Sequence, residues 1–273
     1  MTLTEIRAIL SRENLRLTRS LGQNFLHDGN QLRRIVELAD VHAGDQVLEI
    51  GPGLGPLTEF LLLRGAHVRA VEKDARLIPI LQQRLANHPY LELIHADALD
   101  WLKTDPTTWS SWKLVANLPY SVGSPILVEL AQTPSPPRSL TATLQAEVVD
   151  RIRAQPGTPE YGLLTVLLAE SYLPGPSFRI PASCFFPAPD VASACIRLDY
   201  RTTQLIPTGR SAAFRELAKR AFSQRRKQLR GVLRAYWPET SLDRAFSTLA
   251  LPRDTRAETL SPETLARLSE ELA

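Results

Sequence analysis

The chain of 273 residues has only two cysteines, Cys184 and Cys195, and no cluster of cysteine and histidine at metal-ligand spacing. So few cysteines argue against a disulfide framework and favour a reduced chain in which both thiols pack in the core. The lack of a Cys/His cluster predicts that the protein holds no metal ion.

Long hydrophobic runs are also absent. The longest, such as Phe60–Leu63 and Leu163–Ala169, are far shorter than the ~20 residues that a membrane span requires. The N-terminal segment Met1–Arg12 is charged and amphipathic, and it lacks the continuous apolar stretch of a signal peptide. We therefore expect a cytoplasmic protein that does not associate with a membrane.

Most of the chain lacks a net positive charge, and the excess of basic residues lies in the C-terminal quarter. Residues 206–273 carry 13 Lys/Arg against 8 Asp/Glu, whereas residues 1–205 carry 19 against 21. This distribution favours a near-neutral catalytic part joined to a part that binds a polyanion. A solvated helical surface with surplus arginine is the alternative interpretation.

Apolar periodicity predicts that strands and helices alternate along the first part of the chain. Strands are expected at Gln46–Ile50, His67–Val71, Leu91–His95, Leu114–Ala116, Thr141–Gln145 and Ala194–Asp199. Helices are expected after Asp28, at Leu57–Leu61 and Leu77–Leu85, and over Tyr161–Tyr172, Phe214–Tyr236 and Pro262–Leu272. The pattern predicts an α/β fold with a parallel, doubly wound sheet and a small helical C-terminal domain. With Thr202–Gly209 as the linker, we place the domains at residues 1–205 and 206–273.

The first predicted strand runs into a glycine-rich turn that contains Gly51, Gly53 and Gly55 and is followed by a helix. Glycines let the backbone approach a ligand closely, and the helix N-terminus offers unpaired N–H groups. The spacing G-x-G-x-G differs from the G-x-G-x-x-G of dinucleotide-binding turns, and Glu49 precedes it. An acid at that position disfavours a pyrophosphate and suits the ammonium and sulfonium of S-adenosylmethionine. A tight turn without a ligand is the alternative.

Two further carboxylates follow the next two predicted strands. Glu72 lies 21 residues after Gly51, where an acid would meet both hydroxyls of a ribose. Asp97 ends the third strand and is suited to accept a hydrogen bond from an adenine amine. Either residue alone can be a helix cap, but acids at successive strand ends predict an adenosine pocket.

The fourth predicted strand leads into Asn117-Leu118-Pro119-Tyr120. The N6 amine of adenine is a poor nucleophile because its lone pair is delocalised into the ring. The Asn117 side-chain oxygen and the Leu118 carbonyl could accept hydrogen bonds from this amine and favour a pyramidal nitrogen. Pro119 fixes the turn, and Tyr120 offers a face for stacking the base, worth ~1–3 kcal/mol. An ordinary strand-to-turn sequence is the alternative.

Over nearly its whole length the sequence resembles the ribosomal RNA adenine N6-dimethyltransferases. The motifs that carry the resemblance are Ser20–Leu26, Glu49–Gly55, Glu72, Asp97–Leu99, Asn117–Tyr120, Gln145–Arg151, Tyr161–Gly162, Phe185–Ser193 and Phe222–Lys227. The resemblance implies a Rossmann-like methyltransferase domain with a mostly parallel seven-stranded sheet. It is greatest to the bacterial enzymes that act on the small subunit.

This resemblance also implies roles for individual residues. It implies contacts with S-adenosylmethionine for Asn24, Leu26, Gly51, Glu72, Asp97 and Asn117. Phe185 would stack on the target adenine opposite Tyr120, whereas without the resemblance it would be interpreted as a core aromatic. The implied reaction places two methyl groups on each of two adjacent adenines in the 3′-terminal stem-loop of small-subunit (16S) rRNA. The partner would be the assembling small ribosomal subunit, and the protein would be a monomer.

The sequence departs from the family pattern at three positions. Ala146, Leu163 and Asp190 stand where basic residues are common in the family. The missing positive charges would affect the docking of RNA, whereas the motifs of the cofactor pocket are intact.

The segment Lys219–Arg234 contains seven basic residues and no acidic one. Apolar side chains at helical spacing predict an amphipathic helix that turns Arg225, Arg226, Lys227 and Arg230 outward. Phosphates of folded RNA are the expected partner. Lying on an anionic membrane is the less favoured alternative.

Three other functions remain open at this point. A related enzyme that acts on large-subunit rRNA would share the Asn117–Tyr120 motif. A noncatalytic ribosome-assembly factor would use the same fold to bind RNA, although the intact pocket residues argue against this as the only role. A small-molecule methyltransferase is disfavoured by the same motif and by the basic C-terminal segment.

Overall fold

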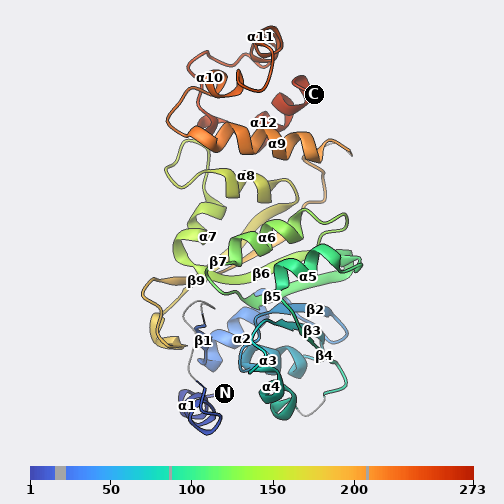
Figure 1. Cartoon of the computed structure of the whole chain (residues 1–273), viewed down its shortest axis with the longest axis vertical. Coiled ribbons are helices and arrows are strands. Elements are labelled where there is room, and N and C mark those ends of the chain that lie inside the picture. Colours follow the sequence, from blue (N-terminus) through green and yellow to red (C-terminus); the bar gives the residue numbers. More distant parts are fainter. Residues whose placement is uncertain (16–22, 86–87, 207–208) are drawn as a thin grey trace. The chain divides into compact units, whose positions relative to one another are not determined.

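The computed structural model describes residues 1–15, 23–85, 88–206 and 209–273 (Figure 1). Contacts divide the chain into two compact units. The first consists of Met1–Val149 and Pro174–Tyr200, and the second of Asp150–Leu173 and Arg201–Ala273.

A seven-stranded sheet in the order β4-β3-β2-β5-β6-β9-β7 dominates the first unit (Figure 1). Strands β2 to β6 run parallel to one another, and β9 pairs antiparallel with β6. The mostly parallel, Rossmann-like sheet is therefore confirmed. The strands are β2 (Gln46–Ile50), β3 (His67–Glu72), β4 (Leu91–His95), β5 (Trp112–Asn117), β6 (Ser139–Gln145), β7 (Tyr172–Ile180) and β9 (Ser193–Tyr200).

Helices connect successive parallel strands, as the alternating pattern predicted. Asp28 caps α2 by accepting hydrogen bonds from the backbone N–H groups of Asn30 and Gln31. The helices of this unit are α1 (Leu3–Arg12), α2 (Gly29–Leu38), α3 (Pro56–Leu63), α4 (Ile78–Arg84), α5 (Ala98–Thr104), α6 (Gly123–Ala131) and the start of α7 (Ala146–Arg153). Cys184 and Cys195 are buried free thiols of this unit, as expected. None of the helices in the described ranges is long and apolar enough to span a membrane.

Three strands were not predicted from the sequence. β7 lies at one edge of the sheet, and four of its nine residues are exposed, Pro174 and Pro176 among them. Because proline cannot donate to a strand ladder, it is tolerated at such an edge but obscures the strand pattern. The other two, β1 (Phe25–Leu26) and β8 (Phe185–Phe186), form a separate antiparallel pair too short to show periodicity.

The second unit is mainly helical and also contains the first two residues of β7. The predicted helix Phe214–Tyr236 is wrong. α9 (Ser211–Ala221) ends before the basic cluster Arg225–Lys227, and α10 (Leu229–Leu233) starts after it. A 3-10 turn covers Phe222–Gln224. The break has a physical cause, because the backbone N–H of Leu229 donates to Thr255 rather than to a preceding turn. The unit is completed by α8 (Leu163–Ala169), α11 (Glu239–Thr248), a 3-10 turn (Ala257–Thr259) and α12 (Pro262–Glu271).

The second unit is larger than the domain expected at residues 206–273, because it includes Asp150–Leu173. Two contacts of that segment explain the difference. The hydroxyl of the fully buried Tyr161 donates to the Leu260 carbonyl at 2.8 Å. The Glu170 carboxylate accepts hydrogen bonds from Arg215 of α9 at 2.7 and 3.0 Å. The predicted helix Tyr161–Tyr172 is correspondingly shorter and covers only Leu163–Ala169.

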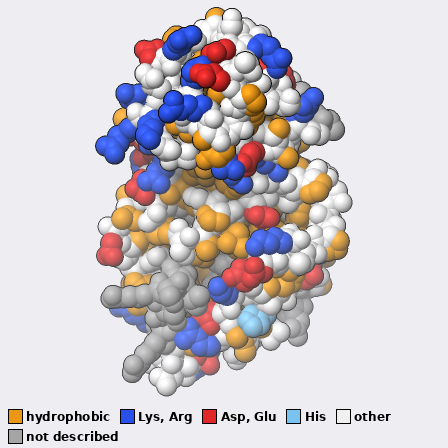
Figure 2. Space-filling view, turned by 45° about the horizontal axis from the view of Figure 1, so that its top comes forward, with side chains coloured by type: hydrophobic (Ala, Val, Ile, Leu, Met, Phe, Trp, Pro, Cys, Tyr) orange, Lys and Arg blue, Asp and Glu red, His pale blue; other side chains and the backbone are white. Residues whose placement is uncertain are grey.

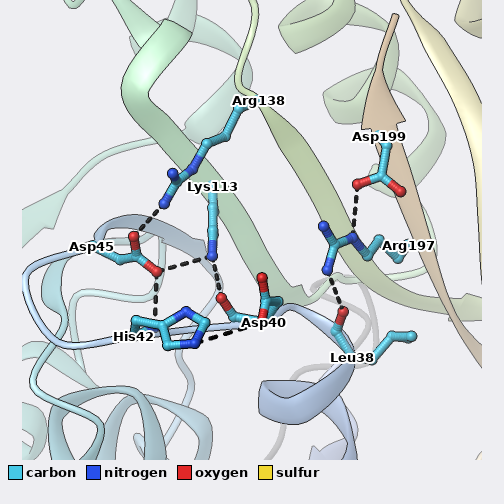
Figure 3. A network of polar contacts seen from close by, with 8 residues as sticks. All are labelled: Leu38, Asp40, His42, Asp45, Lys113, Arg138, Arg197 and Asp199. Carbon is cyan, nitrogen blue, oxygen red and sulfur yellow. Dashed lines mark hydrogen bonds and ion pairs between the residues drawn. The ribbon is translucent and has the colours of Figure 1, made fainter.

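A polar network joins the amino ends of β2, β5 and β6, opposite the glycine-rich turn (Figure 3). Lys113 is 4% exposed, and its ammonium bonds to the Asp45 carboxylate at 2.9 Å and to the Asp40 carbonyl. The other oxygen of Asp45 accepts from Arg138, and the His42 backbone N–H donates to the carboxylate at 2.8 Å. Since a buried ammonium needs a compensating charge, Asp45 is the central residue of this network.

We expect Asp45→Ala to lower the free energy of unfolding by about 3–5 kcal/mol, because the variant leaves the Lys113 ammonium buried without its partner. Arg138→Ala is the matched control, since its side chain is 46% exposed and such pairs are worth about 1 kcal/mol or less. Urea denaturation of both variants measures the difference. Equal losses would show that burial of Lys113 is not what makes the network important.

Candidate active site

The carboxyl ends of β2, β3 and β5 open into one cavity. Its lining includes Glu49 of β2, Glu72 of β3 and Asn117 of β5. The sheet thus brings together three residues that lie far apart in the sequence. Other predicted site residues in the same lining are Asn24, Leu26, Gly51, Gly53, Leu118, Pro119 and Tyr120.

The glycine-rich turn leaves no room for a side chain at Gly53 and little at Gly51. Gly51 and Gly53 have φ values of +70° and +62°. A Cβ atom at Gly53 would lie 2.8 Å from the Phe25 ring, and one at Gly51 would lie 3.3 Å from Pro119. Both the backbone conformation and the close packing therefore require glycine, and the turn presents bare backbone to the cavity.

Glu49 is the most deeply buried acid of the cavity. It is 1% exposed, and its Oε2 has no hydrogen-bond partner among the described residues. Burial, with a smaller contribution from the nearby Glu72, raises the pKa of Glu49 to about 8. A cation that enters the cavity would therefore supply the countercharge that Glu49 needs in order to ionise.

Glu72 is 6% exposed, and the neighbouring backbone fixes its carboxylate. Oε2 accepts from the Gly53 N–H at 3.1 Å and Oε1 from the Asp74 N–H at 2.8 Å. Burial raises the pKa of Glu72, and these hydrogen bonds oppose the rise. Each carboxylate oxygen can accept more than one hydrogen bond, so Glu72 retains capacity for ligand hydroxyls.

Asp97 lines an adjoining cavity that shares Gly51 and Pro119 with the first. Its Oδ1 caps α5 by accepting from Leu99 N–H at 2.9 Å, and its Oδ2 contacts the Lys73 ammonium at 2.7 Å. The Lys73 hydrogen bond lowers the pKa of Asp97, which keeps the carboxylate ionised. Asp97 is thus a helix cap that also faces a cavity. The Lys73 side chain is 61% exposed and can turn toward solvent.

Asn117 has one end of its side-chain amide engaged and the other available. Its Nδ2 donates to the Asn24 carbonyl at 3.0 Å. Its Oδ1 is buried and has no hydrogen-bond partner in the described part of the chain. Because a buried acceptor without a partner is costly, this oxygen is the one expected to receive a ligand N–H.

Two hydrogen bonds to neighbouring strands position Tyr120. Leu118 is buried, and its backbone N–H donates to Thr143 of β6 at 3.2 Å. The Tyr120 hydroxyl shares a 2.5 Å hydrogen bond with Ser193, which is fully buried at the start of β9. Burial raises the pKa of the Tyr120 hydroxyl, so it remains neutral at physiological pH.

Phe185 does not line this cavity in the described chain. It is 3% exposed, pairs with Leu26 in the short β1–β8 ladder, and packs with Ile180 and Cys184 in the hydrophobic core. The pairing with β1 turns this side chain into the core. A stacking role for Phe185 stays a prediction.

The four basic residues predicted to bind RNA differ in their surroundings. Arg230 is held by Glu239 at 2.8 Å and Asp243 at 2.7 Å, and Arg225 donates to the Pro159 carbonyl at 2.7 Å. Arg226 and Lys227 are exposed, and their side chains make no ion pair or hydrogen bond with the described residues. The space-filling view shows basic side chains gathered near its top with carboxylates among them (Figure 2). Two of the four are therefore available for phosphates.

Sequence reasoning missed three residues that support the site. Ser193 holds Tyr120, and Gln23 donates from Nε2 to Asp74 at 2.8 Å. Gln23 and Ser193 both lie within motifs quoted for the family resemblance, which was the available signal. Asp74 had none beyond its place two residues after Glu72. Ser20, Leu21 and Gly22 of the first motif lie outside the described residues.

No group of three or more His, Cys, Asp or Glu side chains that could hold a metal ion occurs in residues 1–15, 23–85, 88–206 and 209–273.

Known proteins are similar to this chain over most of its length. Ribosomal RNA small subunit methyltransferase A of Streptococcus thermophilus is 36% identical over 276 residues, covering 97% of this chain and 95% of the relative. The protein of the same name from Phenylobacterium zucineum is 42% identical over 234 residues, covering 86% and 82%.

Solved structures share the fold. The crystal structure of the 23S rRNA methyltransferase ErmE has a TM-score of 0.68 and 26% identity, covering 91% of this chain and 99% of that one. A dimethyladenosine transferase from Plasmodium falciparum has a TM-score of 0.76 and 23% identity, covering 89% and 95%.

A profile of the family described as ribosomal RNA adenine dimethylase matches residues 14–273. Since the match spans almost the whole chain and the cavity residues are in place, this chain belongs to the ribosomal RNA adenine dimethylase family.

Proposed function

We propose that this protein transfers methyl groups from S-adenosylmethionine to the N6 amines of two adjacent adenines in the 3′-terminal stem-loop of small-subunit rRNA. The observation that carries the proposal is the buried Oδ1 of Asn117, which lies in the same cavity as Glu49 and Glu72 and has no hydrogen-bond partner among the described residues. It supplies a hydrogen-bond acceptor for an amine next to carboxylates suited to a cationic ligand. The names of the relatives at 36% and 42% identity favour the small subunit over the large one.

The residues present fit S-adenosylmethionine. Glu72 would receive the ribose hydroxyls, and Asp97 would accept from the adenine amine once Lys73 turns away. Glu49 would face the positively charged methionine end, which gives its buried carboxyl a countercharge. Bound there, the cofactor supplies the methyl group, and Asn24, Leu26, Gly51 and Gly53 complete the lining.

The catalytic contribution of the chain is to orient the amine. Asn117 Oδ1 and the Leu118 carbonyl would accept its two N–H groups, which favours a pyramidal nitrogen whose lone pair points at the methyl group. Tyr120 would stack on the base, with Ser193 fixing the plane of its ring. No strong general base is needed, because the methylated nitrogen is cationic and loses its proton readily. The rest is positioning for in-line displacement.

Docking of the RNA is assigned to the second unit. Arg226 and Lys227 are exposed, and their side chains have no ion pair or hydrogen bond with the residues that the structure describes, whereas Arg230 already has two carboxylates. We expect the substrate to be the rRNA of the assembling small subunit. A monomer in the cytoplasm remains our prediction.

The first test is to incubate the protein and S-adenosylmethionine separately with small and with large ribosomal subunits from a strain that lacks this protein, and to map the products by mass spectrometry. Wild-type protein should produce two adjacent dimethyladenosines in the 3′-terminal loop. Asn117→Ala should slow transfer by about 10²-fold or more, as loss of a preorganised hydrogen bond to the reacting group does. Methylation confined to large-subunit rRNA, or none, would refute the proposal.

The pKa of Glu49 generates a pH prediction. In the empty protein the pKa is about 8, so the carboxyl is mostly protonated at pH 7. The cationic cofactor favours the ionised form, so binding should release a proton at pH 7. Affinity should therefore rise with pH up to about 8 and level off above it. Calorimetry in two buffers of different ionisation enthalpy measures the proton release, and Glu49→Gln, which cannot ionise, should abolish it. Proton release that persists in this variant would assign it to another group.

The different surroundings of Arg226 and Lys227 on the one hand and Arg230 on the other predict that their variants differ in RNA affinity. Replacing Arg226 and Lys227 with Gln should weaken RNA binding and reduce the salt slope of its affinity by roughly 0.7–0.9 per residue. Arg230→Gln is the control, because Glu239 and Asp243 already neutralise that guanidinium. Titrations with RNA at several salt concentrations measure the slopes. A flatter slope for Arg230→Gln alone would reverse the assignment.

A further inference from the structure

Asp74 is a buried carboxylate just beyond the ribose-binding Glu72, and it is 6% exposed. Its Oδ1 accepts from the backbone N–H and the Nε of Arg76 at 3.1 and 2.8 Å. Its Oδ2 accepts from Arg76 Nη2 at 2.6 Å and from Gln23 Nε2 at 2.8 Å. The Arg76 hydrogen bonds lower the pKa of Asp74. The carboxylate is thus ionised at neutral pH and is a strong acceptor for Gln23.

Gln23 begins the segment Gln23–Leu26, which is held at both ends. Its far end, Phe25 and Leu26, pairs with Phe186 and Phe185 in the β1–β8 ladder. Its near end is held by the Gln23–Asp74 hydrogen bond. Between them, the carbonyl of Asn24 accepts from Asn117 Nδ2 at 3.0 Å.

This arrangement determines which end of the Asn117 amide faces the cavity. An amide has one donor end and one acceptor end, and the Asn24 carbonyl can only bind the donor end. The acceptor Oδ1 is therefore left for the target amine. If Gln23 were released, the Asn24 carbonyl would be held from one side only, and Asn117 would lose its fixed orientation.

We propose that Asp74 is a positioning residue for methyl transfer, acting through Gln23 and Asn24 to direct Asn117 Oδ1 toward the target amine. This inference rests on the proposed function. The backbone N–H of Asp74 also donates to Glu72 at 2.8 Å. Asp74, in the turn that follows β3, thus fixes both the ribose-binding carboxylate and the segment that orients the amide. It therefore fixes the position of the cofactor relative to that of the target amine.

The test exchanges the donor and acceptor of this hydrogen bond. Gln23→Glu places a second carboxylate against Asp74, whereas the double variant Q23E/D74N restores a hydrogen bond with the roles reversed. Arg76 Nη2 loses its acceptor at position 74 in the double variant, and this 43% exposed side chain can turn to the new carboxylate at position 23 or to solvent. Gln83→Glu is the control, because it adds the same charge at an exposed glutamine of α4. Each protein is assayed for single-turnover methyl transfer at saturating S-adenosylmethionine, for deuterium exchange of the amides of residues 23–26, and for melting temperature.

We expect Gln23→Glu to slow transfer by about tenfold or more, since small misplacements of reacting groups have effects of this size. The double variant should return to within about threefold of wild type, and Gln83→Glu should match wild type. Exchange of the Phe25 and Leu26 amides should rise in Gln23→Glu and fall again in the double variant. This exchange readout does not depend on activity.

Two results would overturn the proposal. One is a wild-type transfer rate in Gln23→Glu, even with a lowered melting temperature, because that would make the contact merely structural. The other is a double variant that folds yet is no faster than Gln23→Glu; if it does not fold, Gln23→Ala replaces it and must also slow transfer. A wild-type protein that does not methylate small subunits would instead refute the proposed function. The exchange data would still test whether the Gln23–Asp74 hydrogen bond fixes residues 23–26.

Discussion

The close packing of two glycines is the constraint on which the site depends. Gly53 lies against the Phe25 ring and Gly51 against Pro119, with no space for a Cβ atom at Gly53 and little at Gly51. These contacts bring the β1 segment and the Asn117–Tyr120 turn onto the loop that follows β2. Glu72 then accepts from the Gly53 N–H, which ties the end of β3 to the same turn. Segments from four parts of the sequence thereby share one cavity whose floor is backbone.

Much of this arrangement could be predicted from the sequence, because the determinants are local. Strand β2 was predicted at its observed bounds, since an apolar run ends in glycines there. Parallel strands place their carboxyl ends along one edge, so Glu49, Glu72 and Asn117 were expected together. Asp97 was weighed as a cap or a ligand, and it is a cap that also lines the adjoining cavity.

The remainder depends on contacts between residues distant in the sequence. The helical character of Lys219–Arg234 was overestimated, because the Leu229 N–H donates to the distant Thr255 carbonyl. Counting charges could not reveal that Glu239 and Asp243 neutralise Arg230. Nor could periodicity assign Asp150–Leu173 to the helical unit, since the Tyr161–Leu260 and Glu170–Arg215 contacts decide it. Periodicity also missed the short ladder in which the buried Phe185 pairs with Leu26.

The edge strand β7 has a consequence for the behaviour of the protein at high concentration. An unpaired strand edge offers N–H and carbonyl groups to another chain and can start aggregation. β7 ends the strand order of the large sheet and carries the exposed prolines Pro174 and Pro176, neither of which has an N–H to donate. Intermolecular β-pairing along this stretch is therefore interrupted at two positions. The same residues that hid the strand from sequence analysis protect the sheet from polymerising through that edge.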